Sequence, residues 1–259
     1  MKILLCETSQ GSLNKNIGTE IAPKKIIEEL NNYTFNEDHK KITFQTEKTT
    51  ISQNISETHR NIFNKILEEE PEIILGGDHS ITYSSVKAFS KRFLNPSLII
   101  LDAHPDLETS DLKEPTHEDY LRRLIEKNII SIKNIILIGT RIYSENEIKF
   151  LKEQKILYFD MKKILDLGIK ETTDFITEKA FQLKNIYLSI DIDVLDPAFA
   201  PGTGYIEPGG LTTRELIYLL QRINKLHPKM IDLVEVNPEK DINNTTIKVA
   251  AKIISELAS

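Results

Sequence analysis

The most informative stretch of the chain reads Leu188-Ser-Ile-Asp-Ile-Asp-Val-Leu-Asp-Pro-Ala-Phe-Ala-Pro-Gly-Thr-Gly204. Its first residues continue an apolar and β-branched run that starts at Ile186, which predicts a buried strand. Asp191, Asp193 and Asp196 follow, and the proline after them cannot continue a hydrogen-bonded ladder. Three carboxylates at one strand end repel each other, so they either share a proton or bind a cation.

Length, composition and charge restrict the classes of protein to which the chain can belong. The 259 residues, 40% of them hydrophobic, are enough to bury one large core, so we expect a single domain over residues 1–259. The net charge of −6 and the scattered lysines argue against a phosphate-binding surface, so no nucleic-acid partner is expected. No apolar run has the length of a signal sequence or a membrane span, which indicates a cytoplasmic protein without a membrane partner.

Strand-like and helix-like segments alternate along the whole chain. Eight apolar runs are strand candidates: 2–6, 42–46, 72–75, 98–101, 134–138, 156–159, 186–190 and 230–234. Amphipathic segments with helical spacing separate most of them: 20–32, 56–70, 80–93, 118–127, 144–153, 172–183, 212–226 and 246–257. Nearly continuous apolar strands are typical of a parallel sheet covered on both faces. The pattern predicts an α/β fold, a three-layer α/β/α sandwich with a mainly parallel eight-stranded sheet.

Polar residues follow four of the predicted strands directly. In an open parallel sheet, ligands bind beyond the carboxyl ends of the strands, where such residues meet. Histidine and aspartate ligands suit manganese, iron, nickel or zinc better than calcium or magnesium, and the lack of cysteine ligands disfavours structural zinc. Six potential ligands exceed the needs of one open catalytic ion, so two carboxylate-bridged ions fit better. The six candidates are His79, Asp102, His104, Asp106, Asp191 and Asp193.

Several motifs together resemble one known family. Gly76-Gly-Asp-His-Ser80, Asp102-Ala-His-Pro-Asp106 and the stretch 188–204 are similar to the three signatures of the ureohydrolase family, which includes arginase, agmatinase, guanidinobutyrase and formimidoylglutamase. Gly209-Gly-Leu-Thr-Thr-Arg-Glu215 and Leu233-Val-Glu-Val-Asn-Pro238 also resemble family segments. The resemblance covers nearly the whole chain and implies an arginase-like fold.

The resemblance also implies how two metal ions are bound. One manganese ion would be held by His79, Asp102, Asp106 and Asp191, and the other by Asp102, His104, Asp191 and Asp193. The cofactor would be two Mn²⁺ per chain, with nickel, iron, cobalt or zinc as alternatives. Two divalent ions lower the pKa of a shared water, giving a hydroxide that attacks a guanidinium carbon and releases urea.

Two further residues match catalytic positions of the family. Glu235 matches the glutamate that pairs with the guanidinium group and so orients it for attack. His117 lies near the position of a histidine that shuttles a proton to the departing amine, although it could equally cap the following helix. We expect Asp78 and Asp196 to support their loops rather than to touch metal. The remaining histidines are expected at the surface: His39, His59 and His227.

The substrate is read from the segments where family members differ. The loop at residues 107–116 lacks the asparagine-, threonine- and serine-rich pattern of arginases, whereas Pro201-Gly-Thr-Gly204 resembles the agmatinase motif. These features favour agmatine, cleaved to putrescine and urea, with arginase, guanidinobutyrase or formimidoylglutamase activity as alternatives. Tyr205-Ile-Glu207 departs from agmatinases and keeps other guanidino substrates open. Three acids of the 107–116 loop are suited to attract a second cationic centre: Glu108, Asp111 and Glu114.

Two other classes of protein share some of these sequence features. A metallophosphatase also uses Asp-x-His and Gly-Asp elements, but its motifs come in another order and include a Gly-Asn-His segment that this chain lacks. A metal-binding pseudoenzyme of the same fold is the non-enzymatic alternative, and the complete set of six ligands argues against it. Family members are commonly trimers or hexamers, so the resemblance implies a homo-oligomer whose other partner is a small guanidino substrate.

Overall fold

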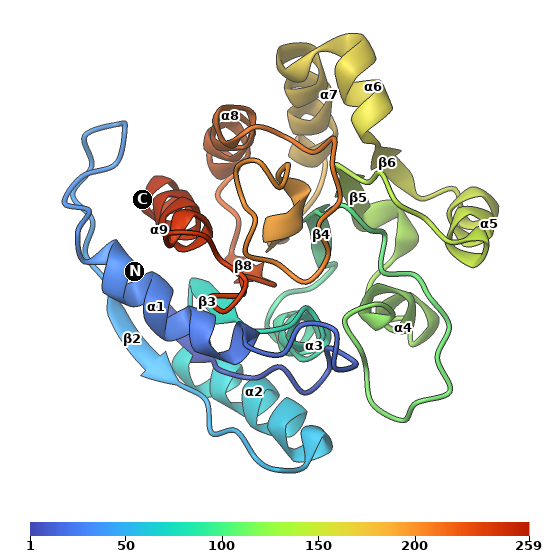
Figure 1. The fold of residues 1–259 in the computed structure, drawn as a ribbon. Coiled ribbons are helices and arrows are strands. Elements are labelled where there is room, and N and C mark those ends of the chain that lie inside the picture. Colours follow the sequence, from blue (N-terminus) through green and yellow to red (C-terminus); the bar gives the residue numbers. More distant parts are fainter. Residues whose placement is uncertain (259) are drawn as a thin grey trace.

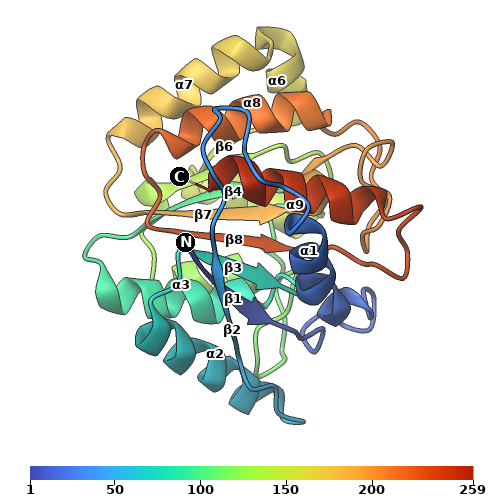
Figure 2. The same cartoon turned by 90° about the vertical axis from the view of Figure 1, so that its left-hand side faces the viewer.

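The sheet has eight strands, and every neighbouring pair is parallel, as predicted. The structure, a computed structural model, describes residues 1–258. The strand order is β2-β1-β3-β8-β7-β4-β5-β6, and Figure 2 shows the arrowheads of β3, β7 and β8 pointing to one side. The strands are β1 (Lys2–Cys6), β2 (Gln45–Lys48), β3 (Ile73–Gly76), β4 (Ser97–Leu101), β5 (Ile135–Ile138), β6 (Leu157–Phe159), β7 (Ile186–Asp191) and β8 (Met230–Val234).

Helices cover both faces of the sheet, which confirms the predicted three layers (Figures 1 and 2). Successive strand residues point to opposite faces, so Ile3 and Leu5 pack into one core and Leu4 and Cys6 into the other. The first core is covered by α1 (Ala22–Leu30), α6 (Met161–Leu167), α7 (Ile169–Phe181), α8 (Thr213–Asn224) and α9 (Thr245–Leu257). The second is covered by α2 (Ile55–Glu69), α3 (Ile81–Arg92), α4 (Tyr120–Glu126) and α5 (Glu145–Gln154).

Local sequence explains where two of these helices begin. Ser144 precedes α5 and Thr212 precedes α8, and each hydroxyl accepts a hydrogen bond from the backbone of a glutamate three residues later. The glutamates, Glu147 and Glu215, bond back to the cap residue, which completes a capping box. These reciprocal bonds satisfy amide groups that have no partner inside the helix.

Two elements differ from the sequence prediction. The strand expected at 42–46 is instead β2, three residues later, because Gln45 pairs with Lys2 at the sheet edge and all four residues of β2 are exposed. An exposed edge strand carries no apolar alternation, so the pattern could not locate it. Helix α6 was not predicted; Asp160 caps it through the amide of Lys163, while Leu165 is exposed and obscures its amphipathic pattern.

The strand order places the predicted site residues on neighbouring strands. Strands β3, β8, β7 and β4 are adjacent in the sheet, although they come from residues 73–76, 230–234, 186–191 and 97–101. Their carboxyl ends therefore meet at one edge, which faces the viewer in Figure 1. The functional segments lie together because of this topology, in agreement with the general rule for open parallel sheets.

One predicted surface residue is buried. His59 lies between α2 and α3, where its Nδ1 is 2.8 Å from the Ser84 hydroxyl, so its expected surface position was wrong. It falls on the face of α2 that packs against α3, and burial lowers its pKa to about 4. His39 and His227 are exposed as expected. Within residues 1–258, no helix combines the length and the apolar character needed to cross a bilayer.

Candidate metal centre

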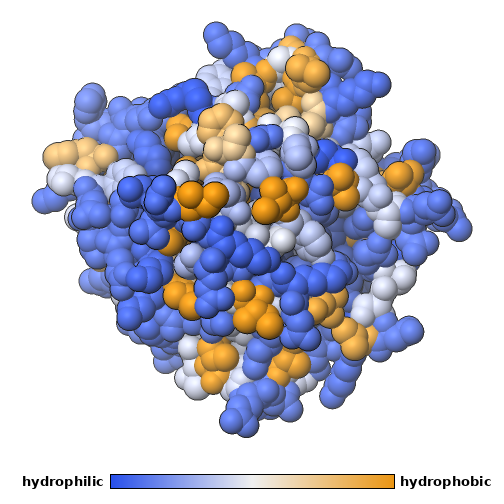
Figure 3. Space-filling model, viewed as in Figure 1, coloured by the Kyte–Doolittle hydropathy of each residue, from blue (hydrophilic) through white to orange (hydrophobic). Residues whose placement is uncertain are grey.

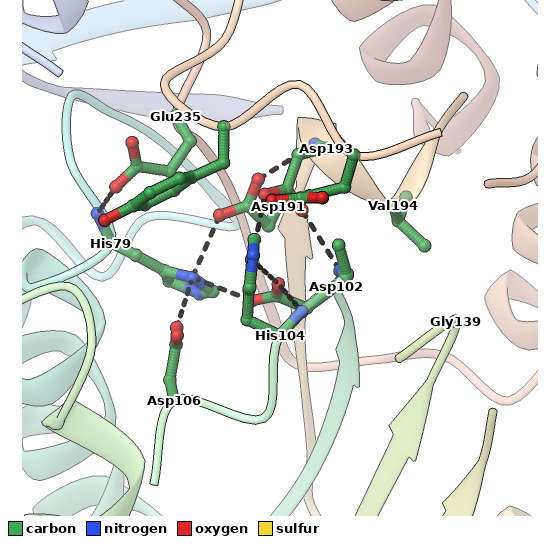
Figure 4. A network of polar contacts seen from close by, with 12 residues as sticks. His79, Asp102, His104, Asp106, Gly139, Asp191, Asp193, Val194 and Glu235 are labelled. Carbon is green, nitrogen blue, oxygen red and sulfur yellow. Dashed lines mark hydrogen bonds and ion pairs between the residues drawn. The ribbon is translucent and has the colours of Figure 1, made fainter. Parts of the chain in front are cut away.

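The centre is built around the imidazole of His79, which lies at the carboxyl end of β3 (Figure 4). Its Nδ1 is 3.1 Å from Oδ2 of Asp102, 3.1 Å from Oδ2 of Asp106 and 3.2 Å from Oδ2 of Asp191. All four residues are buried. The ligand atoms of His79, Asp102 and Asp106 lie within 4.8 Å of one another, which is a donor arrangement suited to a divalent cation, and Asp191 Oδ2 adjoins the same nitrogen.

A second group shares Asp102 with the first. His104 Nδ1 is 3.1 Å from Oδ2 of Asp193 and 3.5 Å from Oδ1 of Asp102. The ligand atoms of His79, Asp102 and Asp106 form one cluster, and those of Asp102, His104 and Asp193 form the other. Asp102 directs one oxygen toward each histidine, so it occupies a bridging position.

Backbone amides hold the carboxylates in place. Asp191 ends β7, and its Oδ1 accepts a hydrogen bond of 2.9 Å from the amide of Asp193, the middle residue of a 3₁₀ turn (Ile192–Val194). Asp193 in turn accepts from the amide of Ala103 at 3.1 Å. Each amide occupies one carboxylate oxygen and leaves the other free to face the centre.

Two residues outside the motifs fix that turn. Gly139, at the end of β5, has φ 93°, and a Cβ there would lie 2.5 Å from Val194 Cγ2, so only glycine lets the turn approach this closely. The Arg141 guanidinium donates to the carbonyl oxygens of Asp193 at 2.6 Å and Leu195 at 3.2 Å. Arg141 was not predicted from the sequence, because a lone arginine after a strand carries no pattern that points to a carbonyl-lined turn.

Buried ligand atoms without a hydrogen-bond partner indicate that the cluster is suited to bind a metal ion. Within residues 1–258, His79 Nδ1 and Asp102 Oδ2 are buried and have no hydrogen-bond partner. Burial raises the pKa of Asp191 well above its usual range, and the charges of Asp193 and Asp102 add to this effect. Burial and the charge of Asp102 raise the pKa of Asp106 to about 8. Concentrated negative charge of this kind is relieved by divalent cations. The structure brings all six predicted ligands together; their role as ligands stays a prediction.

A buried network orients His79 from the other side. Its Nε2 is 2.9 Å from the Ser189 hydroxyl, which donates to Asp232 at 2.6 Å. Asp232 also accepts from Tyr187 and Thr82, so its carboxylate is satisfied although the residue is fully buried. Partners of this kind set the ring orientation of metal-binding histidines. The sequence signal for Asp232 was present, since an acid interrupts the apolar run of β8.

Glu235 lies beside the cluster and is held by both of its oxygens. Its Oε1 accepts a hydrogen bond of 2.6 Å from the backbone amide of His79, and its Oε2 accepts one of 2.5 Å from Asn16 Nδ2. Asn237 donates to Asn16 Oδ1 at 2.6 Å, which fixes the amide orientation. Glu235 itself has φ 64°, a left-handed conformation that is strained for a side chain this long. Asn16 was missed because its loop shows no motif.

His117 contacts Glu235 rather than capping a helix. Its Nδ1 is 3.3 Å from Glu235 Oε1, while Asp119 occupies the cap position of α4. Burial alone would lower the pKa of His117, but the hydrogen bond and charge of Glu235, with Asp78 and Asp106 nearby, raise it to about 9. The helix-capping alternative is therefore wrong, and the imidazole is an available proton donor at neutral pH.

The two supporting aspartates lie as expected. Asp78 is buried and accepts hydrogen bonds from the amides of Gly11 at 3.0 Å and Ser80 at 2.9 Å, so it ties the N-terminal loop to the motif after β3. Asp196 accepts from the amides of Ala198 and Gly209 and holds its own loop together.

A cavity of about 550 Å³ opens over the cluster. It lies on the face shown in Figure 3, which is mainly hydrophilic with separate apolar patches. The inner wall contains His104, Asp106, His117, Asp191, Asp193 and Glu235. The outer wall contains Lys15, Glu108, Glu118, Tyr205 and Glu207. In the part of the chain that the structure describes, Lys15 is the one lysine or arginine of this wall, so carboxylates dominate the cavity.

Comparison with known proteins agrees with this geometry. The sequence matches the Arginase family over residues 4–259. This chain belongs to the arginase family. An arginase of Staphylococcus aureus (strain COL) is 38% identical over 198 residues, which are 70% of this chain and 65% of that protein. The chain thus spans just under two thirds of the length of that relative. The resemblance found in the sequence is confirmed by this match.

Proteins named for another activity are also similar to the chain. The formimidoylglutamase of Bacillus subtilis (strain 168) is 33% identical over 216 residues, which are 77% of this chain and 66% of that protein. The crystal structure of formimidoylglutamase from Bacillus subtilis subsp. subtilis str. 168 superimposes with a TM-score of 0.92 at 27% identity, covering 99% of this chain and 85% of the other. The arginase-like fold is therefore confirmed, while the family contains more than one activity.

Proposed function

We propose that the protein is a hydrolase that uses water to cleave a C–N bond of a linear guanidino compound, releasing urea and an amine. One observation carries the proposal: the Glu235 carboxylate, which can pair with a guanidinium group, adjoins the six-ligand cluster in one cavity. Membership of the arginase family supports it. We propose agmatine as the substrate, with putrescine and urea as products.

The proposal includes two metal positions. His79, Asp102, Asp106 and Asp191 would hold one ion, and Asp102, His104, Asp191 and Asp193 the other. Two divalent cations, manganese in our proposal and nickel, iron, cobalt or zinc as alternatives, supply a water molecule of lowered pKa as nucleophile.

Glu235 orients the substrate. A planar guanidinium paired with a carboxylate is held in a defined plane, so that its carbon faces the nucleophile. The amide of His79 and the side chain of Asn16 keep the carboxylate from rotating. Because Asn16 and the His79 amide are themselves buried, the geometry exists before the substrate binds, and little entropy is lost on binding.

His117 supplies the proton that the leaving group needs. When the C–O bond to water forms and the C–N bond breaks, the departing nitrogen must gain a proton to leave as an amine. The His117 imidazolium, favoured at neutral pH by Glu235, can donate it from the cavity wall. The proton lost by water balances the one that His117 gives away.

The cavity wall supports agmatine over substrates with an acidic tail. Glu108, Glu118 and Glu207 line the outer wall, and among residues 1–258 Lys15 is the one lysine or arginine beside them. A substrate with a guanidinium at one end and an ammonium at the other would meet complementary charge along this wall. The similarity to formimidoylglutamase and arginase makes formimidoylglutamate and arginine the second candidates.

The test is a substrate panel with the manganese-loaded protein. Urea release is measured with agmatine, arginine, guanidinobutyrate, guanidinopropionate and guanidine, and formamide release with formimidoylglutamate. We expect agmatine to have the highest kcat/KM. A higher value with arginine or formimidoylglutamate would contradict the substrate proposal. No turnover of any compound, with two ions bound per chain, would favour the pseudoenzyme.

A further inference from the structure

Three residues from distant parts of the chain form one charged unit at the outer end of the cavity. Lys15 Nζ donates to Glu118 Oε1 at 2.5 Å, and the Tyr205 hydroxyl donates to the same oxygen at 2.7 Å. Lys15 belongs to the loop after β1, Glu118 follows His117, and Tyr205 follows the 188–204 stretch. Two donors therefore converge on a single carboxylate oxygen, which is the arrangement that a receptor for a carboxylate ligand provides.

The aromatic ring of Tyr205 anchors this unit beside the metal cluster. Its centroid is 5.8 Å from that of His117, with the two rings stacked at 22°, and 5.2 Å from that of His104. The Lys15 ammonium lies over the same ring, 5.7 Å from its centroid. The hydroxyl is therefore aimed at Glu118 by the packing of its ring against two residues of the inner wall.

Only the imidazole ring of His117 lies between this unit and the position proposed for the guanidinium. His117 separates the two carboxylates: its Nδ1 is 3.3 Å from Glu235 Oε1, and its Nε2 is 3.9 Å from Glu118 Oε1. A guanidino group held at Glu235 would project its short alkyl tail along this ring toward Glu118. The end of the tail, which is the group that distinguishes one guanidino substrate from another, would meet the Lys15–Glu118–Tyr205 unit.

We propose that Glu118 is a specificity-determining residue that acts as a built-in carboxylate, occupies the donors Lys15 and Tyr205, and thereby excludes substrates whose tail ends in a carboxylate. The inference rests on the proposed guanidino hydrolysis and adds the selection of the tail. An incoming carboxylate would have to displace Glu118 from both donors or lie next to it, and like charges at that distance repel. A neutral or ammonium tail meets no such conflict.

An ordinary surface ion pair would look similar in part. Lys15 is 46% and Glu118 29% exposed, and exposed pairs contribute little to stability. Glu7 and Lys48 form a matched pair outside the cavity, 2.9 Å apart with exposures of 30% and 58%. The two pairs differ in the second donor, Tyr205, and in the position of Glu118 in the cavity wall.

The test compares Glu118→Gln with the control Glu7→Gln in the manganese-loaded protein. Calorimetry measures the affinity for agmatine and for guanidinobutyrate, and urea release measures kcat/KM for both. Replacing Glu118 by the neutral glutamine leaves Lys15 and Tyr205 able to bind a substrate carboxylate. We expect the ratio of guanidinobutyrate to agmatine, in affinity and in kcat/KM, to rise about tenfold or more in Glu118→Gln. The ratio in Glu7→Gln should equal that of the wild type.

A double variant identifies the donor. Adding Lys15→Met to Glu118→Gln should remove the gain in guanidinobutyrate affinity. An unchanged ratio in Glu118→Gln, a gain that survives Lys15→Met, or no binding of either compound to any variant would overturn the inference. A switch in binding without turnover would support the selection by Glu118 but contradict the proposed hydrolysis. Turnover of agmatine with an unchanged ratio of guanidinobutyrate to agmatine would support the proposed hydrolysis but contradict the selection by Glu118.

Discussion

The backbone amide of His79 donates a hydrogen bond of 2.6 Å to the carboxylate of Glu235, although 156 residues separate the two. This bond links the proposed metal cluster to the proposed guanidinium site, because the His79 side chain faces the cluster while the His79 backbone amide contacts Glu235. A change at Glu235 can be expected to affect orientation of the substrate without loss of the metal ligands.

Glu235→Gln should lower kcat/KM for the best guanidino substrate by roughly 100-fold, since a neutral amide forms no charge-assisted bond with guanidinium. The glutamine oxygen can still accept the His79 amide, but its NH2 group then faces the Asn16 Nδ2 donor. We therefore expect a lower melting temperature, while the content of two manganese ions per chain stays the same. The measurements are steady-state kinetics and metal analysis. Unchanged kinetics would show that the guanidinium is bound elsewhere.

Asp193→Ala should remove one ion of the two. Its Oδ2 lies 3.1 Å from His104 Nδ1, whereas the group around His79 keeps all its ligands. We expect metal analysis to find one manganese per chain. Activity should fall by more than the roughly 10- to 100-fold that is typical when a residue hydrogen-bonded to a metal ligand is removed, because Asp193 is itself a proposed ligand. The matched control is Asp196→Ala in the following loop, which should keep two ions. Full activity of Asp193→Ala would refute the two-ion site.

Asn16→Ala should impair turnover through the orientation of Glu235. The amide of Asn16 is the donor to Glu235 Oε2, and Asn237 fixes that amide. Without it we expect kcat to fall about tenfold with little change in KM or metal content, because the loss concerns positioning. Asn14→Gly is the control in the same loop, since Asn14 is exposed and its φ of 61° suits glycine. An effect of equal size in both variants would indicate general damage to the loop.

His59 should make the fold less stable in acid. Its pKa is lowered by burial to about 4, and the opposing charge of Glu114 does not restore the usual value near 6.5. As the pH falls from 6.5 to 4, the unfolded chain binds a proton at His59 that the folded chain does not, so stability is lost in that window. At about 1.4 kcal/mol per pKa unit, the loss amounts to about 3 kcal/mol.

The measurement is urea unfolding of the wild type and His59→Gln between pH 7 and pH 4. The difference in unfolding free energy between the two proteins should shift by about 3 kcal/mol in favour of the variant as the pH falls. His227→Gln serves as the control for removal of an exposed histidine. A difference that stays constant with pH would mean that His59 has the same pKa in the folded and the unfolded chain, which would contradict the prediction.

The sequence by itself determined the layers of the fold and the motifs of the site. Continuous apolar strands such as 98–101 can only be buried on both faces, and the helical periods between them supply the cover. The six metal-ligand candidates were found because each follows a strand, and parallel strands must end at one edge. These features are local, because the hydrophobic period of a helix and the end of a strand can both be recognised within a few residues.

Only the tertiary structure decided which residues support that site. Asn16 meets Glu235 across 219 positions, and Lys15 meets Glu118 across 103, because the strand order places their loops side by side. His59 is buried because α3 packs on α2, and β2 is a strand because β1 pairs with it. Such contacts depend on packing between distant segments, and local periodicity contains no information about which segments become neighbours.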